Sequence, residues 1–118
     1  MQKILIIDDE EDLLFLLGSI LKRKGFEVES LSSGATVDEK VNQFKPDIIL
    51  LDIKLDNGYD GRIICRNLKS QNGVYPKIFL FSGHIRAGDH DAGICGDEFF
   101  EKPIQISELL KKIDQHTN

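Results

Sequence analysis

Residues 48–52 read Ile48-Ile49-Leu50-Leu51-Asp52, four consecutive apolar residues followed by a carboxylate. A short run of this kind is typical of a strand that is buried on both faces, as strands in parallel sheets are. Two further runs have the same character: Ile4–Ile7 is followed by two aspartates, and Ile78–Phe81 is followed by Ser82. The sequence therefore predicts three central strands, each ending in a polar residue.

Patterns typical of amphipathic helices alternate with these runs about every 20 to 25 residues, which indicates repeated strand–helix units around a parallel sheet. One apolar stripe lies within 13–21, and Gly25 is the kind of residue that commonly follows a helix end. A second stripe lies within 34–44. Asp60 and Ser107 can each cap a further helix.

Two weaker strands complete the predicted sheet. Residues 26–31 alternate apolar with acidic residues, which fits an edge strand, and Phe99-Phe100 is too short for the centre. The prediction is an α/β, flavodoxin-like fold: a doubly wound, five-stranded parallel sheet in the order 2-1-3-4-5, counted along the chain, with helices on both faces. The helix expected within 84–96 contains Gly88 and Gly93, so we expect it to be short, frayed or displaced.

Length and composition set limits on the function. The 118 residues fit one domain, residues 1–118, and the net charge of −5 argues against direct binding of nucleic acid. The apolar run near the N-terminus is too short to span a membrane, so we expect no membrane partner. Cys65 and Cys95 have neither CxxC spacing nor a histidine at metal-ligand spacing, so we interpret them as two reduced thiols in a cytosolic protein.

Polar residues follow four of the predicted strands, and in an open parallel sheet the carboxyl ends of the strands form the ligand-binding edge. These residues are Asp8, Asp9, Asp52, Ser82 and Lys102. Three carboxylates packed together cannot all stay ionised at neutral pH without a cation. Mg²⁺ suits such a site because it prefers oxygen ligands and takes only one or two carboxylates from a protein. The sequence thus predicts a magnesium site beside a single lysine.

This set of residues favours phosphoryl transfer. Asp52 is the expected nucleophile, because a carboxylate can attack phosphorus and form a mixed anhydride. Lys102 would neutralise charge in the transition state, and Ser82 would donate a hydrogen bond to the transferred group. Gly83 is small and leaves room for that group.

Four segments carry a resemblance to a known family. They are Ile6-Ile7-Asp8-Asp9-Glu10, Leu50-Leu51-Asp52, Phe81-Ser82-Gly83 and Phe99-Phe100-Glu101-Lys102-Pro103. In this order and on strand ends, they resemble the signature segments of response-regulator receiver domains from two-component systems. The resemblance covers essentially the whole chain.

The resemblance implies a phosphorylation reaction and a metal site. Asp52 would receive a phosphoryl group from a phosphohistidine on a sensor histidine kinase or a phosphotransfer protein, and would lose it again by slow autodephosphorylation. Asp9 would bind Mg²⁺ directly and Asp8 mainly through water. Asp52 and the backbone carbonyl of Lys54 would complete the ligands from the protein.

The resemblance also implies an output. Ser82 and Phe99 would form a switch pair that responds to the phosphate, and the Lys102–Pro103 bond would be cis. A downstream protein would bind the face made by the helix within 84–96, the strand at Phe99 and the final helix. The resemblance further implies a cytoplasmic location. Whether the chain is a stand-alone receiver or part of a longer regulator or hybrid kinase stays open.

The chain departs from the family pattern at several positions. The loop from Lys54 to Gly61 is one residue longer than usual, and Asp56 stands where the family usually has proline. Phe99 lacks the hydroxyl group of the tyrosine found in many relatives. Lys54 and His84 each lie two residues beyond a site residue, so we hypothesise that both influence how water reaches the phosphate.

Other interpretations compete with this one. A pseudo-receiver that binds partners without being phosphorylated is the main alternative. A flavodoxin-like cofactor binder would need a phosphate loop where five consecutive acids stand, and a haloacid-dehalogenase-type phosphatase would need an aspartate in place of Lys54. Taken singly, Asp8 and Asp9 could simply cap the helix that follows them, without binding a metal, and Phe99 could be an ordinary core residue.

Overall fold

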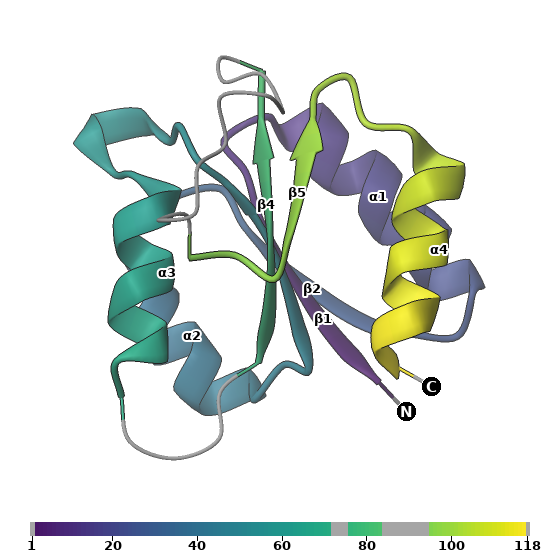
Figure 1. The fold of residues 1–118 in the computed structure, drawn as a ribbon, viewed down its shortest axis with the longest axis horizontal. Helices are drawn as coiled ribbons and strands as arrows, with labels where there is room; N and C mark the ends of the chain where they lie inside the picture. The colour runs from purple at the N-terminus through teal and green to yellow at the C-terminus, as the bar shows by residue number, and fades with distance from the viewer. Residues whose placement is uncertain (1, 72–75, 84–94, 118) are drawn as a thin grey trace.

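The computed structural model describes residues 2–71, 76–83 and 95–117, and a five-stranded parallel sheet forms its middle layer (Figure 1). The order is β2-β1-β3-β4-β5, as predicted. The strands are β1 (Lys3–Ile7), β2 (Glu27–Leu31), β3 (Ile48–Asp52), β4 (Lys77–Ser82) and β5 (Glu98–Glu101). All four neighbouring pairs are parallel.

Among the described residues, one pair of helices packs against each face of the sheet, and the two pairs lie on opposite sides of it (Figure 1). The helices are α1 (Glu11–Arg23), α2 (Val37–Phe44), α3 (Gly61–Lys69) and α4 (Ile106–Thr117), with a short 3-10 helix, η1, at Asp56–Gly58. One core cluster joins α1 and α4 to alternate strand residues such as Ile6 and Leu50. The other joins α2 and α3 to their neighbours Ile7 and Leu51. The central strands are continuously apolar because both of their faces are buried in this way.

The predicted helix ends are correct in two of three cases. Gly25 follows α1 with a φ of +98°, a conformation that glycine adopts without steric cost. The Asp60 carboxylate accepts a 2.8 Å hydrogen bond from the backbone N–H of Arg62 and so caps α3. The Ser107 cap is wrong, because α4 begins at Ile106 and the carbonyl of Gln105 accepts from the backbone N–H of Leu109.

The interpretation of the cysteines as free thiols is also wrong. Cys65 on α3 and Cys95, just before β5, form a disulfide whose Cα atoms are 6.2 Å apart. The two cysteines are 30 residues apart in the sequence, and a spacing of this length does not predict a disulfide. They come together only in the fold, where α3 packs beside the residues that lead into β5. The helix expected within 84–96 lies almost wholly outside the described residues. No helix in the described part of the chain is long and apolar enough to cross a membrane.

Candidate functional site

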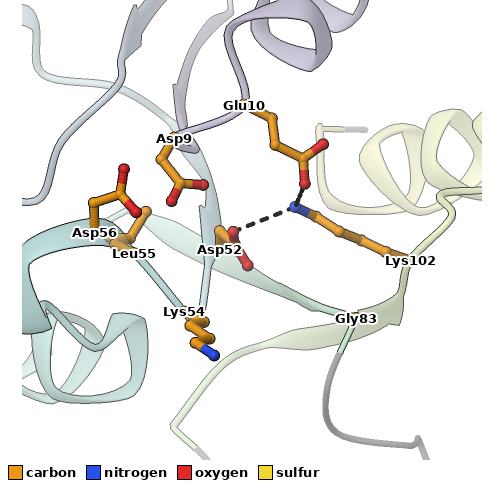
Figure 2. A pocket seen from close by; sticks show the side chains of 8 residues that line it. All are labelled: Asp9, Glu10, Asp52, Lys54, Leu55, Asp56, Gly83 and Lys102. Atoms are coloured by element: carbon orange, nitrogen blue, oxygen red, sulfur yellow. Dashed lines mark hydrogen bonds and ion pairs between the residues drawn. The ribbon is translucent and has the colours of Figure 1, made fainter.

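The carboxyl ends of β1, β3 and β4 meet at one edge of the sheet, beside a pocket of about 400 Å³ (Figure 2). The strand register sets this meeting: Ile7 pairs with Leu51, and Asp52 pairs with Phe81. The first residues beyond the strands therefore lie side by side. The pocket is lined by Asp9, Glu10, Asp52, Lys54, Leu55, Asp56, Gly83 and Lys102.

Lys102 connects the acids at this edge although it follows β5, the last strand. Its Nζ atom lies 2.8 Å from Oδ2 of Asp8 and 3.3 Å from Oδ2 of Asp52. A third contact, also of 3.3 Å, reaches Oε1 of Glu10, a residue that sequence reasoning did not assign to the site (Figure 2). The backbone N–H of Lys102 donates to the carbonyl of Ser82 at 2.9 Å, which ties the lysine to the end of β4.

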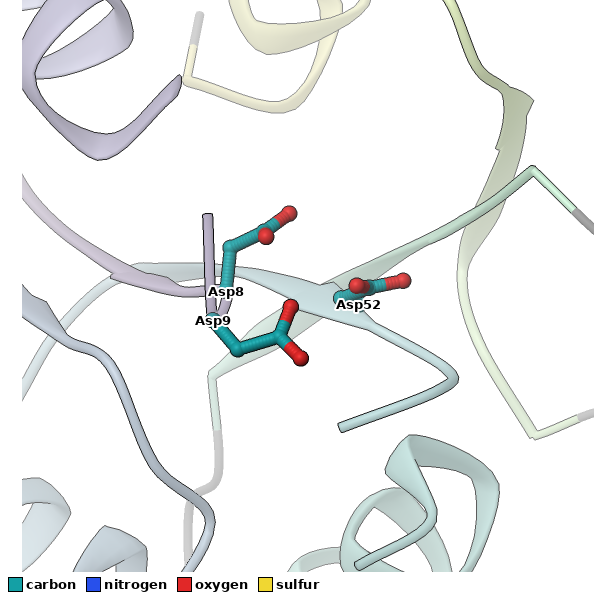
Figure 3. A group of neighbouring side chains, drawn as sticks. All are labelled: Asp8, Asp9 and Asp52. Carbon is teal, nitrogen blue, oxygen red and sulfur yellow. The ribbon is translucent and has the colours of Figure 1, made fainter. Parts of the chain in front are cut away.

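Three carboxylates form a compact group at the ends of β1 and β3 (Figure 3). Asp8, Asp9 and Asp52 can each offer an oxygen atom such that all three atoms lie within 4.8 Å of one another. Asp8 and Asp52 are buried, with 1% and 5% of their surface exposed, whereas Asp9 is half-buried. A set of hard oxygen donors at this spacing fits Mg²⁺.

Burial and mutual repulsion shift the acid–base behaviour of the site. Burial raises the pKa of Asp52 to about 6, and the charge of Asp8 adds to this, while Lys102 and the backbone N–H of Lys54 oppose it. Burial also raises the pKa of Asp8, although Lys102 and the backbone N–H of Glu10 act against it. Burial by itself would lower the pKa of Lys102, but its hydrogen bonds and charge interactions with Asp8 and Asp52 outweigh burial and raise it.

The long loop after Asp52 adds a fourth acid to the pocket. Asn57 and Gly58 adopt φ values of +62° and +78°, which turns the chain through the 3-10 helix η1. Asp56 thereby comes next to Asp9, and a carboxyl–carboxylate hydrogen bond and the charge of Asp9 raise the pKa of Asp56. The loop length and the missing proline were visible in the sequence, but the direction of the Asp56 side chain was not.

The predicted site residues do not all meet in one place. Asp8, Asp9, Asp52 and Lys102 come together as predicted, and buried Ser82 ends β4 beside them. Phe99 does not line the acidic pocket: its half-buried side chain packs with the core cluster of α2 and α3.

Three further predictions concern Lys54, the Lys102–Pro103 bond and His84. Lys54 is one of the residues that line the acidic pocket, but its side-chain amine points away from the acids (Figure 2). The Lys102–Pro103 bond is cis, as the resemblance implied. His84 lies outside the described residues.

Comparison with known proteins identifies the family. A family model for the response regulator receiver domain matches residues 4–114, so the chain belongs to this family. The transcriptional regulatory protein YxdJ of Bacillus subtilis is 34% identical over 96% of this chain and 49% of its own length. The receiver domain of Klebsiella pneumoniae RstA, in a crystal structure described as BeF3-activated, matches with a TM-score of 0.85 and 26% identity, covering 98% of this chain and 97% of that one.

The relatives also bear on partners. The DNA-binding response regulator MtrA of Mycobacterium tuberculosis is 29% identical over 95% of this chain and 49% of its own length. The chain thus spans about half the length of the curated relatives it matches. Because one such relative is named as DNA-binding, the expectation of no contact with nucleic acid is not supported for a protein that contains this domain.

Proposed function

We propose that this receiver is a phosphorylation switch in which Asp52 accepts a phosphoryl group from the phosphohistidine of a histidine kinase or phosphotransfer protein. The observation that carries this proposal is the contact of Lys102 with both Asp8 and Asp52, residues 94 and 50 positions away in the chain. A lysine that only kept the protein soluble would not reach across two strand ends to a buried carboxylate.

The reaction follows from the positions of the side chains. An Asp52 oxygen forms a bond to phosphorus while the bond from phosphorus to the histidine nitrogen breaks, and its electron pair stays on the imidazole. The Lys102 ammonium group offsets negative charge on the phosphoryl oxygens, and it stays protonated because the neighbouring acids raise its pKa. Hydrolysis of the acyl phosphate by water returns Asp52 to its carboxylate.

The acids of the pocket fit a magnesium ion. Asp9 and Asp52 would bind it directly, Asp8 mainly through water, and the carbonyl of Lys54 would complete the protein ligands. Bound Mg²⁺ would neutralise charge on the carboxylate and the phosphoryl group. In the structure, the positive charge next to Asp8 and Asp52 comes from Lys102. Bound Mg²⁺ would add a second positive charge there.

The output belongs to the same proposal. Buried Ser82 would contact the phosphoryl group, and Phe99 would change its packing in response. A downstream protein would recognise the change at β5, α4 and the chain before β5. A cytoplasmic location goes with the proposal, since the kinase phosphohistidine is made from ATP, and residues 1–118 would act as one receiver domain.

Binding of beryllofluoride separates this switch from a pseudo-receiver that is never phosphorylated. The full chain, held at a saturating concentration of Mg²⁺, would be titrated with beryllofluoride while its amide spectrum is recorded by NMR. We expect shifts at Asp52, Ser82 and Lys102 in the wild type and none in Asp52→Asn. A wild-type spectrum that stays unchanged would favour the pseudo-receiver.

A further inference from the structure

The disulfide between Cys65 and Cys95 joins two elements that the phosphorylation chemistry does not use. Cys65 is fully buried in α3, whereas Cys95 is half-buried at the start of the chain that leads into β5. Their Cα atoms are 6.2 Å apart, a separation at which two cysteines can be bonded without moving the backbone.

Polar contacts hold the same two elements together independently of the sulfur atoms. Lys69 Nζ, on α3, donates to the carbonyl of Cys95 at 3.1 Å and to Oδ2 of Asp97 at 3.0 Å. The same Asp97 oxygen accepts from the backbone N–H of Ile78 on β4 at 2.8 Å. The two sulfur atoms therefore stay neighbours when the bond is reduced, and the bond can form again.

We propose that Cys65 and Cys95 form a reversible redox-modification site that reacts with small disulfides such as oxidised glutathione. The Cys95 thiolate attacks one sulfur of the small disulfide, forms a mixed disulfide and releases one thiol. The Cys65 thiolate then attacks the Cys95 sulfur, forms the protein disulfide and releases the second thiol. Each protein thiol gives up one proton, and the small disulfide takes up the two electrons. The difference in burial sets the order of attack. Cys95 is half-buried and reacts first with the small disulfide, whereas Cys65 is fully buried and reacts second.

The position of the bond indicates what it would regulate. The bonded loop from 65 to 95 contains β4 with Ser82, and Cys95 lies four residues before Phe99. Oxidation thus restrains both residues of the proposed switch. In the cytoplasm, a location that rests on the proposed function, disulfides are rare and mostly transient or redox-sensing.

Glutathione exchange on the full chain tests the order of attack. Protein reduced with dithiothreitol would be moved into oxidised glutathione and its intact mass recorded. We expect the wild type to become two hydrogen atoms lighter and dithiothreitol to reverse this. Cys65→Ala should keep one glutathione on Cys95, and Cys95→Ser should stay unmodified. A wild type that keeps glutathione or remains a dithiol would overturn the proposal, as would glutathione on Cys65 alone.

A comparison of the two wild-type forms needs no variant. We expect the oxidised form to have a Tm about 5–15 °C higher than the reduced form and slower amide exchange at Phe99 and Phe100. Equal amide exchange in the two forms would overturn the claim that the bond restrains the switch. Asp52→Asn should show the same redox behaviour, so a failure of phosphorylation would leave these results intact.

Discussion

Lys102 donates to Asp8 at 2.8 Å and lies 3.3 Å from Asp52, so one ammonium group serves two buried carboxylates that repel each other. The shorter contact favours Asp8, and burial together with the charge of Asp8 raises the pKa of Asp52 although Lys102 acts against both. A site arranged in this way has room for one more positive charge.

Asp52→Asn should stabilise the metal-free protein at neutral pH. An aspartate in an unfolded chain titrates near 4, whereas the pKa of Asp52 in the folded chain is about 6. Between these values the folded chain holds a proton that the unfolded chain releases, so stability falls as the pH rises through this window. We expect a gain of roughly 2–3 kcal/mol at pH 7 and little gain at pH 4.

Urea unfolding with EDTA present would measure this difference. Asp38→Asn, at an exposed position in the first turn of α2, is the matched control and should lower the free energy of unfolding by less than about 1 kcal/mol, because only its interaction with the helix N-terminus is lost. If Asp52→Asn were less stable than the wild type at neutral pH, the predicted direction of the change in unfolding free energy would be wrong.

Lys102→Met should slow phosphorylation of Asp52 by roughly 100- to 1,000-fold, the loss typical when a group that stabilises transition-state charge is removed. The variant also leaves Asp8 and Asp52 without their ammonium partner, so the pKa of Asp52 should rise above about 6. Phosphorylation rates from intact mass and an NMR pH titration would measure the two effects. Lys40→Met removes an ion pair of 2.6 Å with Glu29, away from the site, and should change neither.

Asp56→Asn should weaken the binding of Mg²⁺ by roughly two- to fivefold without abolishing it, because an exposed charge acts through a screened field. Asp56 lies beside Asp9 at the mouth of the pocket and adds negative charge there. Calorimetric titration with Mg²⁺ would give the affinity, again with Asp38→Asn as control. Unchanged affinity would show that the longer loop has no part in the metal site.

Gly61→Ala should destabilise the protein by about 1–3 kcal/mol, since an added methyl group would collide with the backbone carbonyl of Asp52. The collision partner is backbone, which cannot rotate away. Gly18→Ala is the matched control, because a Cβ atom there meets nothing within 4 Å and alanine favours the helix interior by roughly 1 kcal/mol. Thermal unfolding of both variants would check the opposite signs, and a stabilised Gly61→Ala would contradict the close approach.

The sequence was sufficient for the sheet and for most of the site because both depend on short patterns. A run such as Ile48–Leu51 fits a strand buried on both faces, and its alternation with helical patterns favours the centre of a parallel sheet. The polar residue after such a strand then lies at the carboxyl edge. Asp8, Asp9, Asp52 and Lys102 followed from this rule together with the family resemblance.

The residues that sequence reasoning missed depend on longer-range geometry. The place of Asp56 in the pocket requires the positive φ values of Asn57 and Gly58, and neither the path nor the direction of that loop follows from a pattern. The bond between Cys65 and Cys95 depends on how α3 packs beside the chain that enters β5. The loop conformation and the disulfide both depend on how distant parts of the chain pack, so no local sequence pattern predicts them.

Incubation with acetyl phosphate and Mg²⁺, followed by intact-mass measurement, tests the central claim most directly. Acetyl phosphate supplies the phosphoryl group without a kinase, so the result depends on this chain alone. The wild type should gain the mass of one phosphoryl group, and Asp52→Asn should gain nothing under the same conditions. No gain in the wild type, or an equal gain in Asp52→Asn, would contradict the assignment of Asp52 as the acceptor.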